Sequence, residues 1–119
     1  MSSRKDILKI KADKLVHLGY DLTFKFPKDE LFCLTSQVRR ALLSVPSNIV
    51  EGYSRNRKKV FVNHLEIAYG SLAEVKYQMN FAFRRNYITK KEYLEFYNLA
   101  EEVSKMLWAS INTLTKIKK

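Results

Sequence analysis

Residues 61–82 read FVNHLEIAYGSLAEVKYQMNFA, and this stretch decides the fold because its apolar residues follow one helical face. They recur at alternating steps of four and three residues: Phe61, Leu65, Ala68, Leu72, Val75, Met79 and Ala82. This spacing is typical of an amphipathic helix that packs along a helical neighbour. We therefore predict one long helix over residues 57–86.

The same pattern recurs on both sides of this helix and predicts three more helices, over residues 6–26, 29–54 and 89–117. Their apolar stripes are Leu8, Ala12, Leu15, Gly19, Leu22 and Phe26; Leu34, Val38, Leu42, Val45 and Ile49; and Phe96, Ala100, Val103, Leu107, Ile111 and Leu114. The connections are so short that consecutive helices must run antiparallel. The sequence thus predicts an all-α fold, an antiparallel up-down-up-down four-helix bundle that forms one domain over residues 1–119.

A few residues mark the ends and irregularities of these helices. Pro27 ends the first helix because proline disfavours helical geometry in the residue before it, and Pro46 predicts a kink in the second. Thr89 and Glu92 have the spacing of a capping box at the start of the last helix. Gly70 lies inside the long helix, where glycine is unfavourable, so we expect another helix to approach closely there.

The composition limits the function classes. The 119 residues include 22 Lys+Arg and 12 Asp+Glu, which gives a formal net charge of +10. The lone Cys33 excludes an internal disulfide and a Cys-rich zinc site, and we expect it to be a small buried apolar residue. No apolar run is long enough for a transmembrane helix. We therefore expect a cytoplasmic protein with polyanionic partners and with no membrane contact, metal or cofactor.

The cations gather in two regions, which we interpret as sites of nucleic-acid binding, to RNA, DNA or both. The candidate residues are Arg39, Arg40, Arg55, Arg57, Lys58, Lys59, Arg84, Arg85, Lys90 and Lys91. Antiparallel helices put residues 55–59 and residues 84–91 at opposite poles. Clusters of this kind suit contacts with the phosphate backbone, which carry no sequence information. The alternative is a solvated basic surface that only keeps the protein in solution.

Residues 55–59 are the strongest candidates of this set. Glu51 is the only carboxylate between Glu30 and Glu66, so four cations within five residues cannot all find an acidic partner nearby, although Glu51 itself suits an ion pair with an arginine. We expect this cluster to matter more than the dispersed lysines of the first helix. Neighbouring aromatic rings could stack on unpaired bases: Tyr53, Phe61, Phe83 and Tyr87.

The long helix carries a second, aromatic face beside its core stripe. Tyr69, Tyr77 and Phe81 recur at multiples of four residues, and Trp108 adds aromatic surface on the last helix. A bundle of this size needs one apolar face per helix, so we predict that these four residues form an oligomer interface. The alternative is a wide core stripe whose rings are half exposed.

Enzymatic motifs are poor, and we assign no catalytic residue and no metal ligand. Arg57 and His64 loosely match the Arg-x(4–6)-His motif of helical HEPN ribonucleases, in which the histidine is the acid/base and the arginine holds phosphate. A HEPN-like ribonuclease is therefore one alternative function, and a protein-interaction scaffold is another.

Three ordered blocks of sequence resemble a bacterial four-helix-bundle family whose founding members are encoded by intervening sequences in large-subunit ribosomal RNA genes. The blocks are residues 26–41, which contain FPKDE and LTSQVRRA; residues 44–52, SVPSNIVEG; and residues 68–74, AYGSLAE. The similarity runs from about Leu15 to Leu114. The same family includes the accessory variability determinant of diversity-generating retroelements, a helper of reverse transcriptase.

The resemblance implies a homopentamer of four-helix protomers with a basic, nucleic-acid-binding surface and no catalysis. It also implies a reverse transcriptase as one candidate partner, or an association with ribosomal RNA intervening sequences. Within the second block, we expect Ser47 and Asn48 to bond backbone groups freed by Pro46 and so to shape the end of the second helix.

Overall fold

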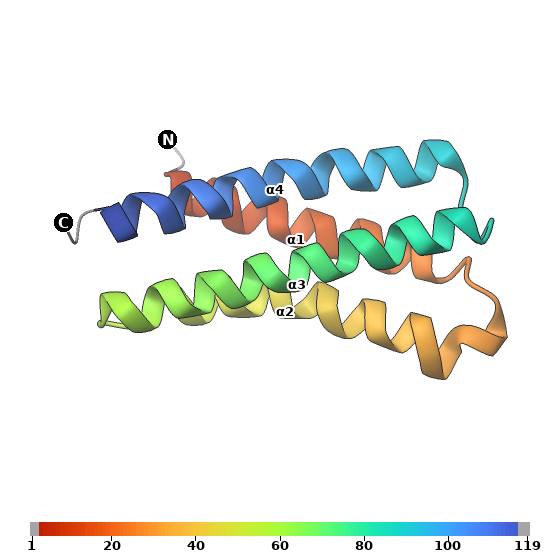
Figure 1. Ribbon diagram of the computed structural model, residues 1–119, viewed down its shortest axis with the longest axis horizontal. Helices are drawn as coiled ribbons and strands as arrows, with labels where there is room; N and C mark the ends of the chain where they lie inside the picture. The colour runs from red at the N-terminus through yellow and green to blue at the C-terminus, as the bar shows by residue number, and fades with distance from the viewer. Residues whose placement is uncertain (1–2, 117–119) are drawn as a thin grey trace.

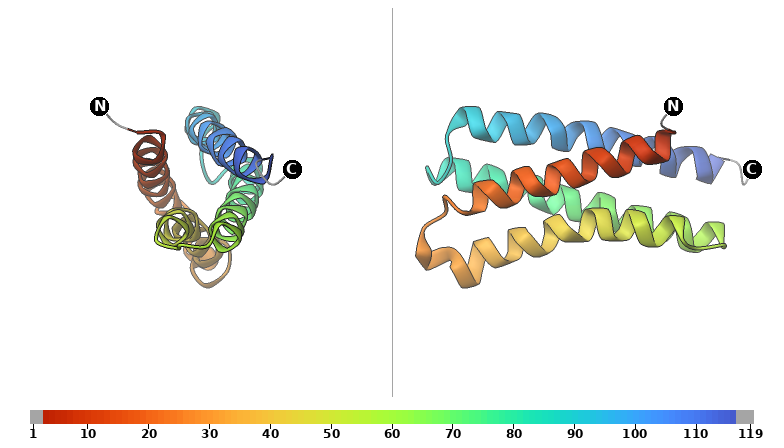
Figure 2. Two further views of the ribbon diagram at one scale, coloured as in Figure 1. Left: turned by 90° about the vertical axis from the view of Figure 1, so that its left-hand side faces the viewer. Right: turned by 180° about the vertical axis from the view of Figure 1, so that it is seen from behind.

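The computed structural model describes residues 3–116 and contains four α-helices joined by short connections (Figure 1). They are α1 (Arg4–Thr23), α2 (Ser36–Tyr53), α3 (Lys58–Arg84) and α4 (Lys90–Lys116). A 3₁₀ turn, η1 (Lys28–Glu30), and a π-helical turn, η2 (Leu31–Thr35), precede α2. Consecutive helices run antiparallel, which confirms the up-down-up-down four-helix bundle (Figures 1 and 2). None of the described helices has a segment long and apolar enough to cross a bilayer.

The largest differences from the predicted boundaries lie around the first turn. The helix predicted to end at residue 26 ends at Thr23, and Lys25 and Phe26 instead bond carbonyls three residues earlier. The segment predicted as one helix from residue 29 divides into η1, η2 and α2. The first correction has a clear cause, because Pro27 restricts the residue before it and has no N–H to donate. The predicted end of the last helix, residue 117, lies outside the described residues.

The predicted stripes form the core. Each residue of the α1 stripe is buried, and so are most positions of the other three. The largest fully buried side chains come from all four helices: Leu8, Leu15, Leu42, Ile49, Leu65, Leu72, Met79, Phe96 and Leu107. Phe61, Ile111 and Leu114 are only partly buried, because they lie near helix ends.

Two glycines have opposite environments, and the prediction for Gly70 is wrong. A Cβ on Gly70 would meet nothing within 4 Å, so no helix of this chain approaches there. The close approach is at Gly19, where a Cβ would lie 2.6 Å from Leu42 Cδ1 and 3.1 Å from Phe96 Cε1. Both neighbours are fully buried, so α1 packs tightly on α2 and α4 only because residue 19 has no side chain.

The same substitution at these two glycines should therefore have effects of opposite sign. Gly19→Ala overpacks the core and should lower the free energy of unfolding by about 1–3 kcal/mol. Gly70→Ala removes a helix-interior glycine without a clash and should raise it by up to about 1 kcal/mol. Urea unfolding followed by circular dichroism measures both; equal effects at the two positions would contradict this packing.

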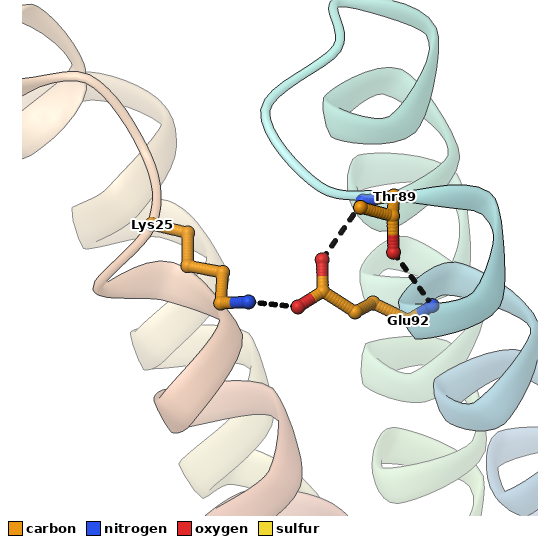
Figure 3. Close-up of polar contacts among 3 residues, drawn as sticks. All are labelled: Lys25, Thr89 and Glu92. Atoms are coloured by element: carbon orange, nitrogen blue, oxygen red, sulfur yellow. Dashed lines mark hydrogen bonds and ion pairs between the residues drawn. The ribbon is translucent and has the colours of Figure 1, made fainter.

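The predicted capping box at the start of α4 is present and also joins the two turns at that end. Thr89 Oγ1 accepts from the Glu92 N–H at 3.1 Å, and Glu92 Oε1 accepts from the Thr89 N–H at 2.8 Å (Figure 3). The other Glu92 oxygen bonds the Lys25 ammonium. These contacts lower the pKa of Glu92, the bond from Lys25 most. Because the folded pKa is depressed, their stabilising effect is present above the ordinary pKa of 4.5 and is lost as the pH falls.

Candidate nucleic-acid interface

The bundle has two cationic poles. At one end the α2–α3 turn lies beside the start of α1 and the end of α4, and we call this end the termini pole (Figure 1). At the other end the α1–α2 and α3–α4 turns meet, and we call it the double-turn pole. The longest dimension of the molecule is 48 Å, so the two poles present separate surfaces. The predicted separation of residues 55–59 from residues 84–91 is confirmed.

The termini pole carries the turn cluster, which we define as Arg55, Arg57, Lys58 and Lys59. Arg55 pairs with Glu51 at 2.7 Å, as expected for that carboxylate. The other three cations form no ion pair with any described residue. A shallow hollow of about 320 Å³ lies between the two arginines and is lined by Arg55, Asn56, Arg57 and Val60. Two arginines thus line an open recess large enough for an anionic group.

The start of α1 adds cations to the same pole, which the sequence analysis missed. The ammonium groups of Lys5 and Lys9 lie 5.0 and 5.7 Å from the centroid of the Tyr53 ring at the end of α2. Burial raises the pKa of Tyr53, although the positive charge of Arg4 opposes the rise. The ring therefore stays neutral at physiological pH and offers its π face to the two lysines. This contact could have been predicted from the antiparallel order of the helices, which puts the start of α1 beside the end of α2.

The first turn of α3 reinforces the positive potential. Its N-cap residue is Arg57, whose side chain caps no backbone group, and the turn contains no acidic residue. Lys58 and Lys59 occupy this turn instead. Cations at a helix N-terminus oppose the helix dipole, and an arriving anion would relieve this repulsion.

The four aromatic rings predicted to stack on unpaired bases all pack on other rings of the bundle. Tyr53 packs on Phe61 with ring centroids 4.7 Å apart, and Phe83 stacks on Tyr93 at 5.1 Å. Tyr87 packs on Phe26 at 5.7 Å, and its hydroxyl donates to Glu30 at 2.8 Å. Each ring is half-buried, and its stacking on bases stays a prediction.

The double-turn pole holds the remaining candidate cations. Arg39 and Arg40 lie in the first turns of α2, so they belong to this pole and not to the turn cluster. Arg84 donates to Asn80 at 2.8 Å. The last three candidates, Arg85, Lys90 and Lys91, are exposed.

This pole also has apolar surface that the sequence analysis did not identify. Phe24 and Phe32 are 73% and 90% exposed. Both lie in the region around Pro27, where the helical spacing that marks buried positions breaks down. Cys33, predicted to be buried, is exposed here as well, because η2 turns it outward.

Most of the predicted interface face is open to solvent. Tyr69, Tyr77 and Trp108 are 38%, 65% and 55% exposed, and Phe81 is half-buried. Lys76 pairs with Glu101 between α3 and α4, and the same antiparallel register puts Trp108 level with Tyr69. We call these four residues the aromatic face.

His64 lies in a polar network between α2 and α3. Its Nδ1 is 3.0 Å from Asn48 Oδ1, and Asn48 Nδ2 donates to the Ser44 carbonyl at 2.9 Å. Asn48 therefore bonds the carbonyl of Ser44 and not that of Leu42, which Pro46 leaves without a donor, so the expected role of Asn48 is not confirmed. Ser47 lines an exposed hollow instead. Across residues 3–116 no group of three or more acidic, histidine or cysteine side chains is arranged to hold a metal.

Comparison with known proteins gives a family match and a structural match. The family model described as 23S rRNA-intervening sequence protein matches residues 5–109. Among solved structures, this chain is similar to a protein of unknown function from the S23 ribosomal protein family of Bacteroides thetaiotaomicron, with 25% sequence identity and a TM-score of 0.83. That match covers 92% of this chain and 99% of the other. No curated protein matches the sequence.

Proposed function

This chain belongs to the 23S rRNA-intervening sequence protein family, and from that premise we propose that it binds nucleic acid, without catalysis, as a homo-oligomer. The ligand is RNA, DNA or both, held mainly through its phosphates. By resemblance to the retroelement members of the family, a reverse transcriptase is a candidate protein partner.

The observation that carries the proposal is the charge balance of the termini pole. Cations from the start of α1 and from the turn cluster converge there: Arg4, Lys5, Lys9, Arg55, Arg57, Lys58 and Lys59. Of the nearby carboxylates, Asp6 belongs to the capping box of α1, Glu51 pairs with Arg55, and Glu66 lines the same hollow as Lys59. The unpaired positive side chains repel one another, and a bound polyanion relieves this repulsion. The polyanion also releases its own counterions on binding, which favours the complex.

Assembly would strengthen these contacts. A second copy seated on the aromatic face would leave the termini pole of each protomer open, because on α3 that face runs from Tyr69 to Phe81, away from the α2–α3 turn. The termini pole would then be repeated in every subunit, and weak phosphate contacts would add through effective concentration. A homopentamer is the assembly that the family resemblance implies.

Equilibrium binding to labelled RNA and DNA oligonucleotides, followed by fluorescence anisotropy at about 50 mM salt, tests the proposal. We expect both to bind, because RNA and DNA share the phosphate backbone that the cations would contact. If neither RNA nor DNA bound, the result would favour the protein-interaction scaffold.

The competing HEPN-like ribonuclease makes a separate prediction at His64. The Nδ1 contact with Asn48 fixes the ring within the α2–α3 interface, which favours a structural role. We expect the native protein and His64→Ala to leave structured and unstructured RNA intact over hours, as seen on denaturing gels. Cleavage that persists through purification and disappears in His64→Ala would support the ribonuclease instead.

A further inference from the structure

A groove of about 220 Å³ at the double-turn pole combines apolar walls with cations. It lies between the end of α1 and η2 and is lined by Thr23, Phe24, Phe26, Pro27, Lys28, Leu31, Thr35 and Arg39. Phe24 and Leu31 are 73% and 46% exposed, so their apolar surfaces are open to a ligand. The lining includes two cations and no carboxylate. This combination suits a ligand that is both flat and anionic.

Arg39 is held in position before any ligand arrives. Its Nε donates to Thr23 Oγ1 at 2.9 Å, and Thr23 Oγ1 in turn donates to the Tyr20 carbonyl at 2.7 Å. The guanidinium carbon lies 4.7 Å from the Phe24 ring centroid and 5.3 Å from that of Tyr20. The two terminal nitrogens, Nη1 and Nη2, have no hydrogen-bond partner among residues 3–116. A planar donor pair is therefore fixed and unused at the groove, which lowers the entropic cost of binding an anion.

We propose that this groove binds one unpaired nucleotide of a single-stranded nucleic acid. The base stacks on the open surface of Phe24, and the terminal N–H groups of Arg39 bond its phosphate. The inference rests on the proposed function and deepens it, because it names single-stranded segments as the ligand of the double-turn pole.

Size and charge favour this occupant. The groove is smaller than the 300–1,000 Å³ typical of pockets for whole small-molecule ligands, and a single base needs little more than one aromatic wall. Bases of a duplex are hidden in their stack, so only an unpaired base can reach Phe24. The exposed Lys28, Arg85, Lys90 and Lys91 lie on the adjoining turns, where flanking phosphates would pass. A second copy of this chain would bring the same net charge of +10 toward a cationic groove.

The test compares binding of short oligo-uridine and of a blunt duplex by fluorescence anisotropy. Phe24→Leu keeps an apolar side chain but removes the ring, and Arg39→Lys keeps the charge but removes the planar donor pair. We expect each to weaken binding of the single strand about tenfold and to change binding of the duplex by less than about twofold. Phe32→Leu is the matched control, because Phe32 is an exposed ring at the same pole but outside the groove, and it should leave both affinities unchanged.

The outcomes separate this inference from the proposed function. If both variants bind oligo-uridine as tightly as the native protein, the groove is not the site, although binding of the duplex would still support the proposed function. If the native protein binds neither ligand, the proposed function itself fails. If Phe24→Leu instead lowers the mass of the assembly in light scattering, a second copy covers the groove and the inference is overturned.

Discussion

Replacing Arg55, Arg57, Lys58 and Lys59 together with alanine should weaken binding to RNA and DNA about a hundredfold at about 100 mM salt. The reason is that the turn cluster supplies most of the excess charge of the termini pole, and three of its members form no ion pair with a described residue. Each lost phosphate contact should also flatten the dependence of log K on log[salt] by about one unit. The fold should survive, because the four side chains lie at the surface, where substitutions usually change stability by no more than about 0.5 kcal/mol.

A matched control removes the same charge from the middle of the bundle. Replacing Lys14 and Lys105 with glutamate also lowers the net charge by four, but these exposed residues lie on α1 and α4 away from the termini pole. We expect a loss of binding far smaller than that of the turn-cluster variant. Equal losses in the two variants would mean that net charge alone, and not this cluster, attracts the nucleic acid.

The second large effect concerns assembly through the aromatic face. In light scattering, the native protein should have a mass that is a multiple of 14.0 kDa, with five copies as the family expectation. Tyr77→Glu combined with Trp108→Glu should reduce the mass to that of one chain, because two carboxylates would be buried in an apolar interface without partners. Both residues are more than half exposed within this chain, so the isolated protomer should still fold.

Phe32→Ser serves as the control for assembly. Phe32 is the most exposed of the large apolar residues and lies on η2, away from the aromatic face. Its replacement should leave the mass unchanged. If the native protein had the mass of one chain at micromolar concentration, the assembly would be contradicted. If Phe32→Ser lowered the mass, the interface would lie at the double-turn pole instead.

The core could be predicted from the sequence because burial in a helix bundle is periodic. The α3 stripe steps by four and three residues without interruption, and the structure buries nearly all of it. The position of each glycine relative to the apolar stripe of its helix also indicates its environment. Gly19 lies on its helix's stripe and marks the close approach, whereas Gly70 lies off the stripe and faces solvent.

The first turn and the site were harder to predict because both depend on contacts between distant segments. Pro27 shortens α1 by three residues and leads into η1 and η2, and no periodic pattern describes such turns. The contact of Lys5 and Lys9 with Tyr53 joins residues more than forty positions apart. Arg39 acquires its fixed orientation only when Thr23 and Phe24 meet it in the folded chain.

The salt dependence of binding tests the central claim most directly. Anisotropy titrations of one RNA duplex at several salt concentrations between about 50 and 200 mM give the slope of log K against log[salt]. For the native protein we predict a straight line with a slope of about −3 or steeper, and for the turn-cluster variant a slope closer to zero by about three units. No binding at the lowest salt, or the same slope for both proteins, would contradict the claim that the termini pole holds the phosphates of a nucleic acid.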